Sequence, residues 1–140
     1  MNIKKLLLAT LAIWLFGIIW TMLTCGWLFN WVYTIPPIIW KQPTEMMMMG
    51  NMIGSNIMGL TGTFLFVLVY ALLYKTLPKK GVNKGIFYGF LVYLVGPFSG
   101  FIGMPFYMTI ANTYVIYALI NMLVKYLIMG AIVGAIYKTK

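Results

Sequence analysis

The sequence predicts an all-α, polytopic integral membrane protein, a bundle of four transmembrane helices. Of its 140 residues, 63% are hydrophobic and only 8% are charged, whereas about a quarter of the residues of a soluble domain are charged. The apolar residues form four runs, and each is longer than the roughly 20 residues that a helix needs to cross a bilayer. We therefore expect a single transmembrane domain over residues 1–140.

The first span is expected at residues 3–29. Lys4 and Lys5 before an apolar run resemble the start of a secretory signal peptide, but the run continues without a small-x-small cleavage site. We therefore interpret it as a retained span. Residues 30–45 contain two adjacent prolines, which interrupt a continuous helix. We expect a long interfacial outer loop between the first two helices, with a short re-entrant loop as the alternative.

The second span is expected at residues 50–74, and its two halves differ in composition. The first half is rich in small and polar residues, and the second half is bulky and apolar. Small residues four positions apart let helix backbones approach closely. Close packing is therefore one interpretation of the first half, and the lining of a polar cavity is the other. The polar side chains concerned are Asn51, Ser55, Asn56 and Thr61.

The third span is expected at residues 85–108, where Gly85 and Gly89 lie on one helix face. Pro97 lies near the middle of this span. Because proline removes one backbone hydrogen bond, we expect a kink there, either as a moving hinge or as a fixed bend.

The fourth span is expected at residues 114–137 and carries one charged residue, Lys125, near its centre. At 100° per residue, Asn121 shares the face of Lys125, and Gly130 and Gly134 lie on the opposite face. This helix is therefore expected to make contacts on two sides. In a membrane complex, we expect such glycine faces to dock on neighbouring subunits.

Lysines flank the spans asymmetrically. With four crossings, eight lysines fall on one side of the membrane and Lys41 falls on the other. The positive-inside rule then predicts a protein of the cell membrane with both termini in the cytoplasm. The eight lysines are Lys4, Lys5, Lys75, Lys79, Lys80, Lys84, Lys138 and Lys140.

Residue types that carry catalysis are almost absent. The chain has no histidine, no aspartate, no arginine and one glutamate, Glu45. General acid–base catalysis and histidine-activated nucleophiles therefore lack their groups, and we expect neither an enzyme nor a cofactor. The basic residues are all lysines at the ends of apolar runs, so nucleic acid is not an expected partner.

Four consecutive methionines occupy residues 46–49. Thioether sulfur binds Cu(I), but consecutive residues on a helix point in different directions, and methionine commonly fills apolar space. We therefore expect no metal site.

The partner of Lys125 is the central question, because Glu45 is expected roughly half a membrane away. The candidate partners are backbone carbonyls, tyrosine hydroxyls, a lipid phosphate, a bound anion, or a carboxylate on another protein. Otherwise this lysine is partly snorkelled, deprotonated or hydrated.

Two functional hypotheses follow. In the first, the protein is an accessory or assembly subunit of a larger membrane complex, and Lys125 meets an acidic partner on another chain. In the second, it is a small oligomeric transporter or binding protein for an anionic solute or lipid headgroup in an outward-facing vestibule. Other small basic membrane proteins, such as bacteriocin immunity factors or holins, share this composition. In the vestibule, Lys125 and Asn121 would bind the anion, and the walls would be Asn51, Ser55, Asn56, Thr61 and Ser99.

Overall fold

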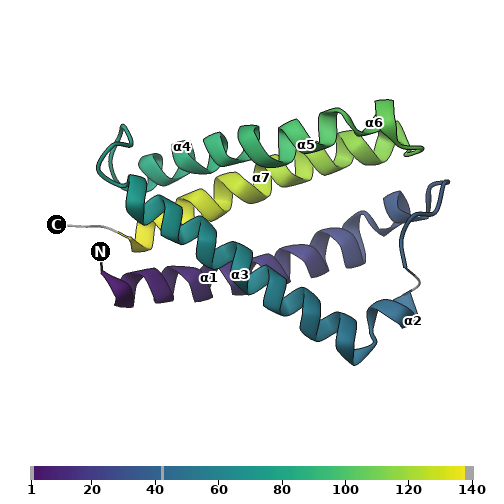
Figure 1. The fold of residues 1–140 in the computed structure, drawn as a ribbon, viewed down its shortest axis with the longest axis horizontal. Helices are drawn as coiled ribbons and strands as arrows, with labels where there is room; N and C mark the ends of the chain where they lie inside the picture. The colour runs from purple at the N-terminus through teal and green to yellow at the C-terminus, as the bar shows by residue number, and fades with distance from the viewer. Residues whose placement is uncertain (1, 42, 138–140) are drawn as a thin grey trace.

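The computed structural model describes residues 2–41 and 43–137, and these residues form helices and turns without a strand (Figure 1). Within this part of the chain, four helices are long and apolar enough to cross a membrane. This confirms the predicted all-α, multi-pass fold class. The four spans are Ile3–Leu28, Met49–Leu73, Gly81–Tyr107 and Asn112–Ile136.

Two of the spans, α3 (Met49–Leu73) and α7 (Asn112–Ile136), are continuous α-helices, and the other two change helical type along their length. Pro97 lies in the third span, within a π-helical turn. Because proline lacks the backbone N–H that an α-helix uses at this position, the hydrogen-bond pattern changes there. The remaining elements are α1 (Ile3–Leu23), η1 (Thr24–Leu28), η2 (Asn30–Thr34), α2 (Pro43–Met46), α4 (Gly81–Tyr93), η3 (Leu94–Phe98), α5 (Ser99–Ile102) and α6 (Met104–Tyr107).

The first and last described residues lie together at one end of the molecule, which we call the terminal end (Figure 1). There the backbone N–H of Asn2 donates to the Tyr137 hydroxyl at 3.3 Å. The opposite end carries α2 and α6, and we call it the loop end. Lys138 and Lys140, which contributed to the topology prediction, lie outside the described residues.

Helices α4 and α7 form a close pair whose contact consists of glycine backbone. A Cβ atom on Gly85 would overlap the carbonyl oxygen of Gly130 and would lie 2.8 Å from Cα of Gly134. A Cβ atom on Gly89 would overlap the carbonyl oxygen of Tyr126. The structure therefore corrects the expectation that these glycines dock on neighbouring subunits. Residues 94–111, which include η3, α5 and α6, connect the two helices, and the glycine faces of α4 and α7 pack against each other inside the chain.

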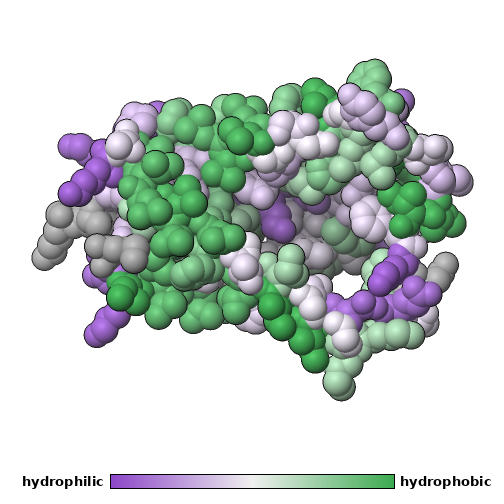
Figure 2. Space-filling model, in the orientation of Figure 1, coloured by the Kyte–Doolittle hydropathy of each residue, from purple (hydrophilic) through white to green (hydrophobic). Residues whose placement is uncertain are grey.

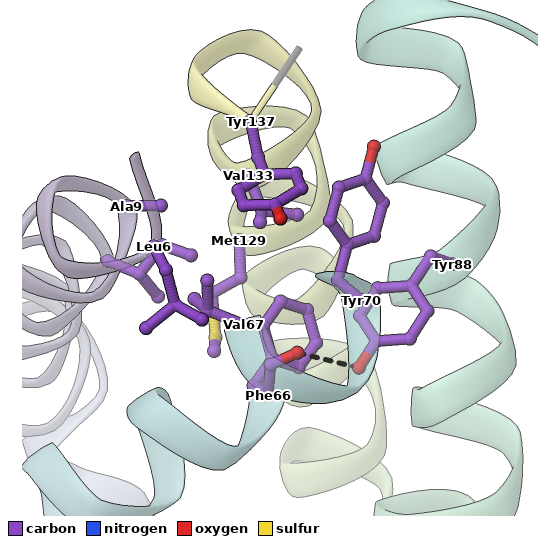
Figure 3. Close-up of a cluster of buried hydrophobic side chains, with 10 residues drawn as sticks. Leu6, Ala9, Phe66, Val67, Tyr70, Tyr88, Met129, Val133 and Tyr137 are labelled. Atoms are coloured by element: carbon purple, nitrogen blue, oxygen red, sulfur yellow. Dashed lines mark hydrogen bonds between the residues drawn. The ribbon is translucent and has the colours of Figure 1, made fainter. Parts of the chain in front are cut away.

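The hydrophobic core lies in the terminal-end half and joins all four spans (Figure 3). The Tyr88 hydroxyl donates to the Phe66 carbonyl at 2.7 Å and so ties α4 to α3. The ring of Tyr70 makes edge contacts with several tyrosine rings, with centroid separations of 5.2 Å to Tyr88 and 6.1 Å to Tyr137. The labelled core residues are Leu6, Ala9, Phe66, Val67, Tyr70, Tyr88, Met129, Val133 and Tyr137.

A buried lysine fixes the connection between α3 and α4. Lys84, which the sequence placed among the loop lysines, is only 8% exposed. Its Nζ donates to the Tyr74 carbonyl at 2.8 Å and lies 4.3 Å from the centroid of the Tyr74 ring. The ammonium group therefore sits at the negative end of the α3 dipole, where a cation stabilises the helix.

Toward the loop end, α3 leaves the other helices. Residues 52–62 are all exposed, whereas Thr63, Phe66, Val67 and Tyr70 further along the same helix are buried. Figure 1 shows this half of α3 running away from α4 and α7 toward α2. The two halves that differ in composition therefore also differ in packing, and the small-residue half is left largely uncovered.

Candidate binding groove

A cavity of about 660 Å³ lies between four helices near the middle of the molecule. We call it the groove. It is lined by residues between positions 13 and 22 of α1 and between 55 and 69 of α3, by Tyr88 and Val92 of α4, and by three residues of α7 that include Lys125. In the side view of Figure 2, a hollow with hydrophilic surface at its bottom is bordered by hydrophobic surface.

The groove opens sideways, toward the surface that lipid would cover. Three large apolar lining residues are themselves strongly exposed, namely Met22 (70%), Met58 (73%) and Leu65 (51%). Because the spans run along the long axis, which is horizontal in Figures 1 and 2, the hollow in this view opens perpendicular to them. The rim therefore faces hydrocarbon if the four helices cross a bilayer.

Lys125 is the only charged side chain among the described residues that line the groove. Along the axis of α7, Lys125 lies about 20 Å from Asn112 at the start of the helix and about 16 Å from Ile136 at its end. This half-buried lysine forms no hydrogen bond or ion pair with any residue that the structure describes.

The ammonium group of Lys125 is also accessible. Only one side-chain nitrogen or oxygen atom in residues 2–41 and 43–137 is both sealed from solvent and without a hydrogen bond, and it is the Tyr70 hydroxyl oxygen. Nζ of Lys125 has no hydrogen-bond partner and is not among the sealed atoms, so it retains accessible surface, and Lys125 is one of the residues that line the groove. An anionic group that entered the groove could therefore reach it.

The small polar side chains of the groove have their hydrogen bonds within their own helices. Thr21 donates to the Gly17 carbonyl at 2.9 Å, and Thr63 donates to the Gly59 carbonyl at 2.7 Å. In the same way, Ser55 and Asn56 both donate to the carbonyl of Met52, at 3.0 and 2.8 Å. These side chains make the wall less apolar without requiring a polar ligand.

The structure brings together only part of the predicted vestibule. Ser55, Asn56 and Lys125 line the groove. Asn51 does not, because its amide donates to the Glu45 carbonyl at 2.6 Å and its oxygen accepts from Lys41 at 3.4 Å.

The other three predicted wall or binding residues also lie outside the groove lining. The Thr61 hydroxyl donates to a carbonyl of its own helix, and the Ser99 hydroxyl donates to two carbonyls at the π-helical turn. Asn121 accepts a hydrogen bond from Trp20 Nε1 at 2.8 Å and donates to the Tyr117 hydroxyl at 3.0 Å. Asn51, Thr61, Ser99 and Asn121 therefore do not line the groove, and their part in a vestibule stays a prediction.

Asn121 has a structural position that the sequence did not indicate. Its bond to Trp20 joins α1 to α7 about one turn from Lys125. A buried tryptophan N–H commonly finds such a partner. The helical wheel had placed Asn121 on the same face as Lys125, but a wheel does not show which side chain of another helix meets it.

The described residues of the loop end form no ion pair with Lys125. The Cys25 sulfur lies 2.9 Å from the Tyr33 hydroxyl. Burial, followed by the hydrogen bond with Cys25, raises the pKa of Tyr33, so this phenol stays neutral at physiological pH. The only carboxylate side chain of the sequence, Glu45, is exposed and lies in α2, outside the four spans.

The chain was compared with models of protein families, with curated proteins and with solved structures, and no match was found in any of the three.

Proposed function

We propose that this protein is an accessory or assembly subunit of a larger membrane complex, and that Lys125 forms an ion pair with a carboxylate on another chain. The observation that carries this proposal is the position of Lys125: it lies in the groove, near the middle of a span, without an ionic partner in the described chain. Its ammonium group is accessible, so a partner would not have to unfold α7 to reach it.

The energetics favour an external partner. A lysine at the centre of a membrane helix costs about 3 kcal/mol on insertion scales, and an aspartate costs about as much. Two chains that each carry one such charge offset both costs by pairing. An interaction of about 3 kcal/mol corresponds to roughly a hundredfold preference for the assembled state.

The flanking lysines support an orientation for this subunit. Lys75, Lys79 and Lys80 lie in the connection between α3 and α4, and Lys4 and Lys5 lie at the start of α1, all at the terminal end. We propose that this end faces the cytoplasm and that the protein resides in the cell membrane.

Purification from native membranes tests the proposal. The tagged full-length chain and its Lys125→Met and Lys125→Arg variants are solubilised in mild detergent, and co-purifying proteins are identified by mass spectrometry. We expect Lys125→Met to lose a partner that the wild type and Lys125→Arg retain, because arginine keeps the charge. Lys41→Met, which removes an exposed lysine at the loop end, is the matched control. An unchanged set of partners in folded Lys125→Met would contradict the proposal.

A second candidate function is the binding or transport of an anionic solute or lipid headgroup by a small oligomer. The volume of the groove, about 660 Å³, supports it, because pockets for small ligands range from about 300 to 1,000 Å³. For this function, Lys125→Met would stay assembled with the same proteins and would lose solute binding or movement.

A further inference from the structure

We propose that the groove receives a single transmembrane helix of a different chain, which enters sideways from the lipid and carries one carboxylate opposite Lys125. This inference rests on the proposed function and adds the binding surface and the kind of partner that fits it.

The first step concerns the shape of the surface. Helices α1 and α3 bury residues in their terminal-end halves, such as Ile13 and Phe66. Toward the loop end, residues 52–62 of α3 are all exposed, so this part of the helix is largely uncovered. The gap is open on the lipid side, where Met22 and Met58 form part of the rim.

The second step concerns how closely a helix could approach. Three glycines line the groove, Gly17 on α1 and Gly59 and Gly62 on α3. A Cβ atom on Gly17 or Gly62 would meet nothing within 4 Å, and one on Gly59 would meet only the Trp14 ring at 3.9 Å. Open space beside glycine backbone is the surface that membrane helices use for close contact. Unlike the glycines between α4 and α7, Gly17 and Gly62 have no neighbouring helix against them among the described residues, and Gly59 has only the Trp14 ring.

The third step concerns chemistry. Lys125 is the only charged side chain among the described lining residues, and the rim is apolar. The small polar side chains donate hydrogen bonds to backbone carbonyls of their own helices. The matching occupant is an apolar segment with one anionic group. A second copy of this chain does not fit, because its one carboxylate, Glu45, lies outside the spans.

The depth of Lys125 distinguishes a helix from a free amphiphile. The charged headgroup of an amphiphile is most stable at the interface, about 15 Å from the bilayer centre. Lys125 lies about 16 to 20 Å from the two ends of α7 and therefore near the centre. A carboxylate that is covalently fixed in the middle of a transmembrane helix is already at this depth, and pairing with Lys125 removes its cost there.

The volume of the groove sets the extent of the contact. One helical turn with its side chains, about 10–12 Å wide and 5.4 Å long, occupies roughly 400–600 Å³. The groove of about 660 Å³ therefore accommodates roughly one turn of the partner helix. We expect the carboxylate to lie within that turn, with the rest of the partner helix against α1, α3 and lipid.

Photo-crosslinking in native membranes tests this inference. A photoreactive phenylalanine analogue is placed at Met22, Met58 or Leu65 on the rim, and at Leu72 as a control, because Leu72 is 68% exposed on α3 but does not line the groove. We expect the three rim positions to crosslink the same protein and Leu72 to leave it unlabelled. Peptide mapping should place the crosslinks in one transmembrane segment that has an aspartate or glutamate near its centre. Adding Lys125→Met to the rim variants should reduce the product about tenfold or more, which corresponds to a loss of at least about 1.4 kcal/mol.

Each other outcome overturns the inference. Crosslinks to lipid alone would assign the groove to an amphiphile, and crosslinks between copies of this chain would assign it to self-association. Crosslinks to a segment without a carboxylate would also be contrary to it. If Lys125→Met loses its partner during purification while the rim positions crosslink nothing, the subunit function stands and the groove is not its docking site. If the partner is retained and the rim is unlabelled, both proposals fail.

Discussion

Replacing Gly85 by alanine should separate the closest pair of helices in the molecule. The new Cβ atom would overlap the Gly130 carbonyl oxygen and would lie 2.8 Å from Cα of Gly134. Ordinary contact begins at 3.4 Å, so the Gly134 contact alone would require a displacement of 0.6 Å, and the overlap with the Gly130 carbonyl oxygen would require more; these are backbone atoms that cannot rotate aside. A gap of 0.5–1 Å already removes a quarter to a half of the dispersion energy of a contact.

The expected loss of stability follows from two opposing effects. Inserting a methyl group into a well-packed interface costs typically 1–3 kcal/mol, and the direct backbone overlap favours the upper end, about 3 kcal/mol. Alanine recovers about 1 kcal/mol through its higher helix propensity. We therefore expect Gly85→Ala to lower the free energy of unfolding by about 2 kcal/mol.

The assay is reversible unfolding in mixed micelles, with the helical signal in far-UV circular dichroism followed as sodium dodecyl sulfate is added. Gly54→Ala is the matched control, because a Cβ atom on Gly54 of α3 meets nothing within 4 Å. The control should be neutral or more stable by up to about 1 kcal/mol. If Gly85→Ala unfolds at the same detergent fraction as Gly54→Ala, the close contact between α4 and α7 is wrong.

The same assay checks two further predictions. Tyr88→Phe should cost about 1 kcal/mol because it removes the hydrogen bond to the Phe66 carbonyl, whereas Tyr70→Phe should be neutral or stabilising because the buried Tyr70 hydroxyl has no partner among the described residues. Equal losses in the two variants would contradict this assignment. Trp20→Phe should cost about 0.6–2 kcal/mol, and a double-mutant cycle with Asn121→Leu should return most of that value as coupling between α1 and α7. Additive losses would show that this bond does not hold the helices together.

The positions of the four spans could be predicted from the sequence because the thickness of the bilayer dictates the length of a crossing helix. Each apolar run is longer than a crossing requires, and the observed helices begin and end within four residues of the expected ones. The largest difference is at the third span, which begins at Gly81 instead of at residue 85. Gly81 has φ of +58°, a conformation that glycine adopts readily, so the chain turns there and enters the helix directly.

Helix pairing was harder to predict because a small-residue pattern does not identify its partner. Gly85 with Gly89 and Gly130 with Gly134 were recognised as close-packing pairs, but they were expected to face other subunits. In the structure, they face each other. Glycines with open space lie instead on other helices, such as Gly17 and Gly62, and the same sequence pattern is compatible with both outcomes.

The site was predicted at its charge and along only part of its walls, where Ser55 and Asn56 line the groove. Lys125 was singled out because a lysine near mid-span needs a reason, and it does line the groove. Asn121 was assigned to the same site from helix periodicity, and Asn51 from the polar composition of the first half of its span. Both amides are instead used by hydrogen bonds to groups that periodicity does not reveal, Trp20 and the Glu45 carbonyl. The burial of Lys84 was missed for a similar reason, because a lysine beside a loop gives no sign that it will cap the preceding helix.

The two faces of α7 together explain how Lys125 can be accessible on a helix whose position is set by other residues. Gly130 and Gly134 hold one face against α4 by backbone contact, and the bond between Asn121 and Trp20 fixes the helix to α1 one turn from the lysine. These contacts determine the position and rotation of α7 without using the Lys125 side chain. When Lys125 meets a carboxylate, its side chain still loses rotamer entropy, but the position of its helix is already set by these contacts. A weakened α4–α7 contact should therefore reduce partner binding even though no groove residue changes. Gly85→Ala, measured by the co-purification assay under conditions where it remains folded, should retain less partner than Gly54→Ala.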